Sequence, residues 1–170
     1  QNNLYMKALI AAFPENLTEA LAIATQNPLK YKYPKFNNVV ICGMGGSGIG
    51  AKLVGSWIAD ELNVPLNFCQ DYTLPNYVDA NTLLIASSNS GNTEETLLAT
   101  EEGRQKGASI IGVSSGGKLK DFCTQWQYDC IIVPGGAPPR TTLAFSIVQL
   151  IHIFEELNLI NSRKSTQFIK

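Results

Sequence analysis

The sequence predicts an α/β fold, a doubly wound (flavodoxin-like) αβα sandwich built on a five-stranded parallel sheet with N-terminal helices packed on it. Five short apolar runs rich in β-branched residues recur along the 170 residues, and longer stretches with helical spacing separate them. The runs are apolar throughout, which is typical of strands buried on both faces. Regular alternation of strand and helix predicts a parallel sheet covered on both sides.

Each expected element is justified by its own pattern. The expected strands, as β-branched apolar runs, cover Asn38 to Cys42, Leu66 to Phe68, Thr82 to Ala86, Ser109 to Val113 and Cys130 to Val133. The expected helices, where apolar residues recur at helical spacing, cover Gly48 to Leu62, Thr93 to Lys106, Leu119 to Trp126 and Thr141 to Leu157. Asn2 to Thr25 has the same spacing but contains Pro14, so we expect two short helices there, packed on one edge of the sheet.

Composition excludes several classes of function. The 13 Lys and Arg and the 14 Asp and Glu give a net charge of −1 and are scattered, so we expect no nucleic-acid and no membrane partner. The chain has neither a membrane-length apolar stretch nor a signal-peptide pattern, which predicts a cytoplasmic protein. The four cysteines lack CxxC spacing and a nearby histidine, so we expect buried thiols and no metal site.

Three expected strands end in loops of unusual chemistry. GMGGSG at 43–48 follows the first strand, SSNSGNT at 87–93 the third, and PGGAPPR at 134–140 the fifth. In open parallel sheets ligands bind beyond the carboxyl ends of the strands, where strand order reverses. The first N–H groups of a helix are unpaired and its dipole is positive there, which favours a phosphate. We therefore expect a phosphorylated small molecule as the ligand.

The hydroxyl residues of these loops have a simpler interpretation, as helix caps. Ser47, Ser90 and Thr93 each stand near an expected helix start, and Ser and Thr side chains accept hydrogen bonds from first-turn N–H groups. One cap satisfies one helix start, however, so the other hydroxyls of the 87–93 loop would still need a partner. We therefore favour ligand binding for that loop.

Gly43, Gly45 and Gly48 offer another alternative, because they fit the GxGxxG pattern of dinucleotide-binding folds. Asp71, beyond the second expected strand, would then be the ribose ligand. A dinucleotide site does not require a hydroxyl-rich loop after the third strand, however, and Asp71 lies in the turn-like segment DYTLP. A phosphorylated small molecule remains the preferred ligand.

Four motifs together resemble the sugar isomerase (SIS) domain family. They are GMGGSGIG at 43–50, SSNSGNTEET at 87–96, GVSSGGKL at 112–119 and PGGAPPR at 134–140. They are similar in particular to the N-terminal domain of bifunctional phosphoglucose/phosphomannose isomerases. The resemblance implies an N-terminal helical segment at 1–37, a SIS domain at 38–160 and, at 161–170, the start of a linker to a second SIS domain.

The resemblance also implies roles for residues and partners. The phosphate of a sugar phosphate would be bound by Ser88, Ser90 and Thr93, and its sugar contacted by Gly46 and Ser47. The expected reaction interconverts glucose 6-phosphate or mannose 6-phosphate with fructose 6-phosphate through an enediol(ate). Because isomerisation moves only protons, we expect no metal or other cofactor. We expect the assembly to be a homodimer.

Arg140 matches the arginine that the family places beside the reacting carbons, which makes it the expected catalytic residue of this chain. Its guanidinium stays protonated, so it stabilises charge but cannot transfer the proton. His152 lies in an apolar helix, and Glu94 or Glu95 would repel the phosphate. In the resembled isomerases the base and the ring-opening acid come from a second SIS domain, so we expect this chain alone to be inactive.

Two other functions fit a SIS domain. One is a sugar-phosphate-sensing module of a transcriptional regulator, although the arginine in PPR has no evident purpose there and no basic DNA-binding segment precedes Asn38. The other is a single-domain phosphosugar isomerase that assembles its site between subunits. The GGSG and PPR stretches favour the two-domain branch.

Overall fold

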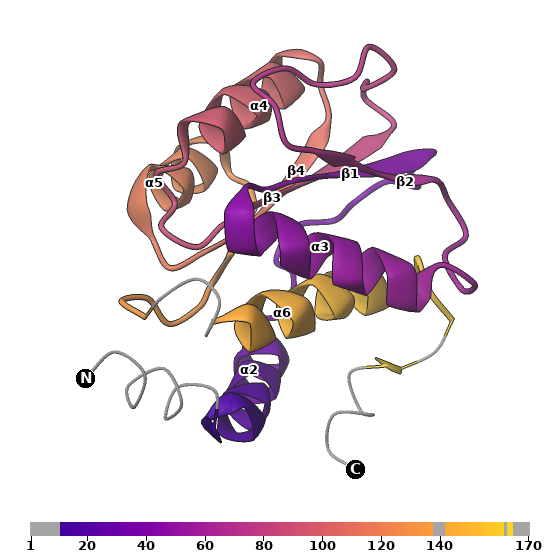
Figure 1. Ribbon diagram of the computed structural model, residues 1–170. Coiled ribbons are helices and arrows are strands. Elements are labelled where there is room, and N and C mark those ends of the chain that lie inside the picture. Colours follow the sequence, from indigo (N-terminus) through magenta and orange to yellow (C-terminus); the bar gives the residue numbers. More distant parts are fainter. Residues whose placement is uncertain (1–10, 138–141, 162, 165–170) are drawn as a thin grey trace.

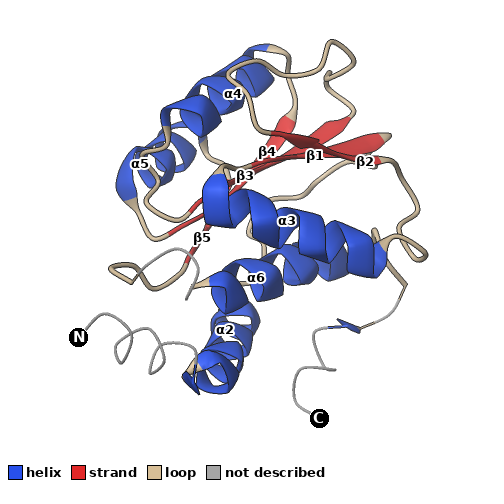
Figure 2. Cartoon of the chain, in the orientation of Figure 1, coloured by secondary structure: helices blue, strands red, loops and turns tan. Residues whose placement is uncertain are grey.

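The computed structural model describes residues 11–137, 142–161 and 163–164. Its elements, in chain order, are α2 (Phe13–Gln26), β1 (Asn38–Cys42), α3 (Gly45–Ile58), β2 (Leu66–Cys69), β3 (Thr82–Ser88), α4 (Glu94–Gln105), β4 (Ser109–Ser114), α5 (Gly117–Trp126), β5 (Asp129–Ile132) and α6 (Leu143–Glu156). The five strands form one parallel sheet in the order β2-β1-β3-β4-β5. Helices α3 and α6 cover one face, and α4 and α5 cover the other (Figures 1 and 2). The predicted fold class is confirmed.

The central strands supply both layers of the hydrophobic core. Every residue of β3 is buried, and successive side chains of a strand point to opposite faces of the sheet. Leu83 and Ile85 therefore join the core beneath α3 and α6, whereas Leu84 joins a second cluster on the opposite face. This two-sided burial explains why the strands read as unbroken apolar runs in the sequence.

Pro14 marks the start of the second of the two expected N-terminal helices. It lies in the first turn of α2, where its missing N–H group would have had no helical partner. The earlier part of the predicted helical region, before residue 11, lies outside the described residues.

The predicted position of the N-terminal helix on an edge of the sheet is wrong. Helix α2 packs against α6, below one face of the sheet (Figure 1), where the Gln149 side chain donates a 2.8 Å hydrogen bond to the Ala20 carbonyl. Helix α6 is apolar around most of its circumference, and such a helix must be covered on both sides. The sheet covers one side, and α2 covers the other.

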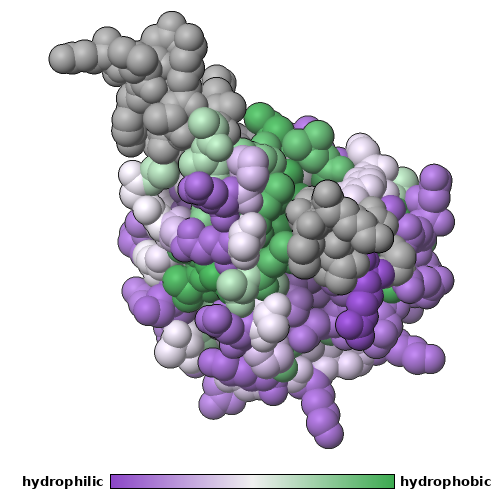
Figure 3. Space-filling model, turned by 90° about the horizontal axis from the view of Figure 1, so that it is seen from below, coloured by the Kyte–Doolittle hydropathy of each residue, from purple (hydrophilic) through white to green (hydrophobic). Residues whose placement is uncertain are grey.

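Apolar side chains also remain on the surface. Seen from the side of α2 and α6, the molecule shows a hydrophobic band among hydrophilic regions (Figure 3). On α3, Ile49, Leu53 and Trp57 are exposed, and their spacing of four residues places them along one side of the helix, which we call the α3 stripe. No helix in the described part of the chain is both long and apolar enough to cross a lipid bilayer.

Asp129, the first residue of β5, anchors the segment that leads into β1. Its buried carboxylate accepts hydrogen bonds from the backbone N–H of Lys30 at 3.0 Å and Tyr31 at 3.2 Å. The Tyr33 hydroxyl donates a third bond at 2.7 Å. Burial, together with this carboxylate, raises the pKa of Tyr33 above its usual value, so the hydroxyl remains a donor.

Replacing Asp129 with Ala should destabilise the fold, because three donors lose their acceptor. Hydrogen bonds to a charged group contribute about 1.5–3 kcal/mol each, so we expect a loss of at least about 2 kcal/mol in the free energy of unfolding. Asp129→Asn is the matched control, because it keeps the shape of the side chain and one acceptor oxygen. Its free energy of unfolding should fall by less than that of the Ala variant. Urea unfolding of the three proteins measures both effects, and an Ala variant as stable as the parent would contradict this account of the anchor.

Candidate functional site

The two strands between which the order of the sheet reverses, β1 and β3, end side by side. Cys42 pairs with Ala86 in the register of these strands, and β2 lies on the far side of β1. The loops after β1 and β3 therefore start next to each other, where ligands bind in open α/β sheets. An added Cβ on Gly43 would lie 3.0 Å from the Ser87 carbonyl oxygen, so this glycine lets the two backbones touch.

The loop after β1 is shorter than the sequence predicts, because α3 begins at Gly45 and not at Gly48. Gly45 has a φ of +53°, which glycine adopts without steric cost. Met44 precedes the helix, and its side chain forms no cap. Gly46 and Ser47 lie in the first turn, with Ser47 only 7 % exposed. The residues predicted to contact a sugar thus stand at the start of a helix that no side chain caps.

The segment 88–93, from the last residue of β3 to the start of α4, holds three hydroxyl side chains, two of which contact each other. Ser88 Oγ and Thr93 Oγ1 are 2.9 Å apart, and the Gly91 N–H donates to Ser88 Oγ at 3.1 Å. Ser90 Oγ accepts a 3.1 Å bond from the Asn92 N–H. The structure therefore brings together Ser88, Ser90 and Thr93, as predicted, in a compact loop next to the glycine-rich one.

Helix α4, which follows this loop, has no side-chain cap. Thr93 is its N-cap residue, but the Thr93 hydroxyl bonds to Ser88 and makes no capping hydrogen bond. The interpretation of these hydroxyls as helix caps therefore fails for α4. Its first-turn N–H groups, at the positive end of the helix dipole, are the type of group that binds phosphate.

A second segment, residues 114–119, which runs from the last residue of β4 into the first turn of α5, braces the 88–93 loop. The Ser115 N–H donates to the Asn89 carbonyl at 2.9 Å, and the Leu119 N–H donates to the Gly91 carbonyl at 2.9 Å. The Lys118 N–H donates to Asn92 Oδ1 at 3.1 Å. First-turn N–H groups of α5 are thus used within the protein, in contrast to those of α4.

The brace depends on close backbone contact at a glycine. An added Cβ on Gly91, whose φ is +71°, would overlap the Gly116 carbonyl oxygen. This role of the motif GVSSGGKL was not predicted from the sequence, nor was that of Asn92. The signal available in the sequence was the adjacent pair Gly116 and Gly117, each with positive φ in the structure.

The third predicted loop is described only in part. Gly135 meets Ser115, because an added Cβ on Gly135 would lie 2.8 Å from the Ser115 Oγ. The loop after β5 therefore reaches the 114–119 segment at the same edge of the sheet. Arg140, the predicted catalytic residue, lies outside the described residues.

Two of the three acid–base candidates, His152 and Glu95, interact with residues outside the loops at the strand ends. His152 Nε2 lies 3.4 Å from the Asn27 carbonyl oxygen, at the end of α2, and 3.9 Å from Glu156. It belongs to the packing of α6 on α2. Glu95 interacts with Tyr72, whose pKa it raises, and Glu94 is exposed in the first turn of α4.

The remaining alternatives gain no support from the geometry. Asp71, the ribose ligand of the dinucleotide interpretation, accepts a 2.7 Å hydrogen bond from the N–H of Tyr72, within its own turn. Within the described ranges, no cluster of three or more His, Cys, Asp or Glu side chains could hold a metal ion.

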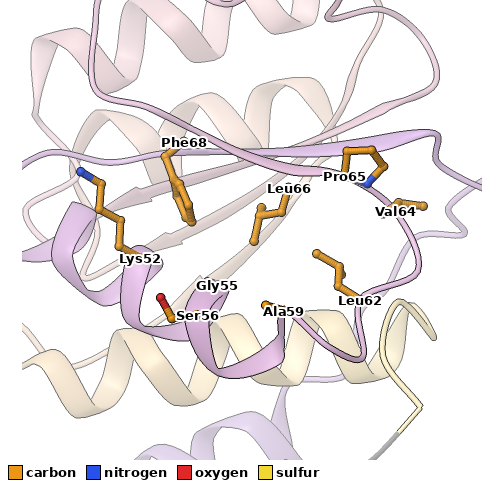
Figure 4. Close-up of a pocket in the computed structure, with 9 residues that line it drawn as sticks. All are labelled: Lys52, Gly55, Ser56, Ala59, Leu62, Val64, Pro65, Leu66 and Phe68. Carbon is orange, nitrogen blue, oxygen red and sulfur yellow. The ribbon is translucent and has the colours of Figure 1, made fainter.

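A sizeable pocket lies away from these loops, between α3 and the edge strand β2 (Figure 4). Its volume is about 620 Å³. Apart from Lys52 and Ser56 its walls are mostly apolar, and they comprise Gly55, Ala59, Leu62, Val64, Pro65, Leu66 and Phe68. The pocket holds none of the predicted site residues, so the loops at the strand ends, and not the pocket, are the candidate site.

Comparison with known sequences identifies several relatives, most of them named bifunctional phosphoglucose/phosphomannose isomerase. No protein-family model matches the chain. A bifunctional phosphoglucose/phosphomannose isomerase from Caldicellulosiruptor bescii is 43 % identical over 147 residues, which are 86 % of this chain and 43 % of the relative. The chain thus spans less than half the length of this relative.

Solved structures share the fold at low identity. The tagatose-6-phosphate ketose/aldose isomerase from Escherichia coli superposes with a TM-score of 0.63 at 17 % identity, covering 97 % of this chain and 45 % of that one. The protein c3406 of E. coli CFT073, solved in complex with a ligand, superposes with a TM-score of 0.61 at 20 % identity and covers all of both chains. These neighbours have the fold of the SIS phosphosugar isomerases.

Gly91→Ala should destabilise the protein more than Gly107→Ala, the matched control. Both glycines have similar positive φ, +71° and +79°, so both alanines meet the same strain of about 1–2 kcal/mol. Only the Gly91 variant adds a backbone clash, since the nearest atom to an added Cβ on Gly107 is 3.6 Å away. We expect about 1–3 kcal/mol of additional loss in urea unfolding. Equal losses in the two variants would mean that the contact between Gly91 and Gly116 can adjust without a loss of stability.

Proposed function

We propose that this chain, which belongs to the phosphosugar isomerases with the SIS fold, binds a hexose phosphate at the carboxyl ends of β1 and β3. The substrate class follows from the relatives, named for phosphoglucose and phosphomannose. The reaction would interconvert glucose 6-phosphate or mannose 6-phosphate with fructose 6-phosphate. The enediol(ate) course of this reaction is part of the proposal.

One observation carries the phosphate assignment: the start of α4 is uncapped although hydroxyls surround it. Ser88 and Thr93 share one hydrogen bond, so one of their two hydroxyl protons remains for a ligand. Ser90 Oγ accepts a bond from the backbone, which leaves its own proton as a donor. Two hydroxyl donors beside first-turn N–H groups suit the oxygens of a phosphate.

The remainder of the site rests on the resemblance and on the strand ends. Gly46 and Ser47, at the start of α3, would contact the sugar. Arg140 would stabilise the negative charge of the intermediate. We propose that the base and the ring-opening acid come from outside this chain, because its one histidine packs against α2.

The organisation of the whole protein is also a proposal. Residues 1–37 would form the N-terminal helical segment, 38–160 the SIS domain, and 161–170 the start of a linker to a second SIS domain. We further propose that the chain associates as a homodimer. The α3 stripe of Ile49, Leu53 and Trp57 supports association, because exposed apolar residues on one side of a helix favour burial against another surface.

Ser90→Ala should weaken binding of fructose 6-phosphate. Loss of one hydrogen bond to a charged phosphate costs about 1.5–3 kcal/mol, roughly a ten- to hundredfold loss of affinity. Ser56→Ala, an equally small change at an exposed position on α3, should leave the affinity unchanged. Isothermal titration calorimetry compares the variants, and undiminished affinity in Ser90→Ala would rule out this residue as a phosphate ligand.

The chain should bind fructose 6-phosphate but isomerise it slowly. Without a positioned base the rate should be roughly 10²–10⁴-fold below that of the related enzyme from C. bescii. A coupled spectrophotometric assay of both proteins, with calorimetry to show binding, measures the difference. If the chain matched the rate of the relative, the base would have to lie within it, and His152 and the glutamates would be reconsidered.

A further inference from the structure

The four cysteines form two neighbouring pairs. Cys42 and Cys69 are register partners on β1 and β2. Cys123, near the end of α5, and Cys130, on β5, meet beside Gly112 of β4. An added Cβ on Gly112 would lie 2.9 Å from the Cys123 sulfur and 3.0 Å from the Cys130 sulfur. The absence of a side chain at this position therefore leaves the space that the two sulfurs share.

Access distinguishes the two pairs. Cys42 is 1 % exposed, Cys69 6 % and Cys123 0 %, whereas Cys130 is only partly buried. Cys130 also lines a pocket of about 330 Å³, together with Lys30 and Lys120. A small reagent in solution can therefore reach one cysteine of the Cys123–Cys130 pair directly, and neither cysteine of the Cys42–Cys69 pair.

The surroundings of Cys130 also favour its reactive form. The contact with Cys123 lowers the pKa of Cys130 and the charge of Lys120 lowers it further, whereas burial and the carboxylate of Asp129 raise it; the net shift is downward. The same contact and burial raise the pKa of Cys123, which stays a thiol. The Cys42 contact lowers the pKa of Cys69 to about 6, so access, and not acidity, separates the two pairs.

We propose that Cys130 is a site of oxidation by peroxide and that Cys123 closes it to a disulfide within the chain. The Cys130 thiolate attacks one oxygen of hydrogen peroxide, the O–O bond breaks, and a sulfenic acid and hydroxide form. The Cys123 sulfur then attacks the Cys130 sulfur, and the S–O bond breaks. The protons of the two thiols complete two waters. Two thiols lose two electrons, and the peroxide gains them.

The position of the pair gives this oxidation a structural consequence. Cys123 lies one helical turn after Leu119 on α5, and both are buried in one cluster. The N–H of Leu119 donates to the Gly91 carbonyl in the brace. Sulfurs in a disulfide are about 2.05 Å apart, so closing the bond draws the end of α5 toward β5 while the beginning of the same helix holds the 88–93 loop.

Peptide mapping of the oxidised chain tests the proposal. The native protein is treated with hydrogen peroxide and then unfolded in denaturant, its remaining thiols are alkylated with N-ethylmaleimide, and its peptides are analysed by mass spectrometry. We expect a linked Cys123–Cys130 peptide, with Cys42 and Cys69 recovered in alkylated form as the internal control. Linkage of Cys42 to Cys69 first, or recovery of Cys123 and Cys130 as alkylated thiols, would overturn the proposal.

Two variants separate the roles within the pair. Cys123→Ser should trap Cys130 as the sulfenic acid, which dimedone labels, because the second thiol is missing. Cys130→Ser should leave Cys123 unoxidised, because the accessible thiol is missing. Oxidation of Cys123 in the Cys130→Ser variant at the rate of the parent would refute the assignment. The mapping of the parent protein stands independently, should either variant fail to fold.

Discussion

The pairing of β1 with β3 is the constraint on which the candidate site depends. The chain runs from β1 outward to β2 and then returns to place β3 on the other side of β1, and in open parallel sheets ligands bind at such a reversal of strand order. The two loops that carry the site residues meet there without a side chain between them, at Gly43 and Ser87. The positions of the loops after β1 and β3 both follow from this one arrangement.

The two helices after β3 and β4 use their first turns differently. Helix α5 donates N–H groups to the 88–93 loop, so its positive end is already satisfied by the protein. Helix α4 begins directly after that loop and keeps its first turn uncapped. One helix thus orders the loop, and the other is the proposed source of donors for a phosphate. A loop ordered before binding loses less conformational entropy when the ligand arrives.

Sequence patterns predicted the parts of the fold that depend on local periodicity. The five strands, the helices between them and the hydroxyl-rich loop with Ser88, Ser90 and Thr93 were all predictable, because apolar runs and loop composition are local properties. The position of α2 on α6 and the bond from Lys118 to Asn92 depend on contacts between distant segments. No single-sequence pattern encodes such contacts. The start of α3 at Gly45 could not be predicted either, because it depends on the positive φ of Gly45, and glycine can adopt either sign of φ.

The register of β1 with β3 also bears on how the protein folds. Val39 pairs with Leu83, and all of α3 and β2 lie between them along the chain. Contacts of such long sequence separation require the closure of large loops, which slows folding of parallel sheets. The contact between the two loops therefore has no counterpart in isolated segments of the chain. It forms only when β3 docks beside β1, so that a nascent or proteolytically cut chain without β3 has the glycine-rich loop but lacks the candidate site.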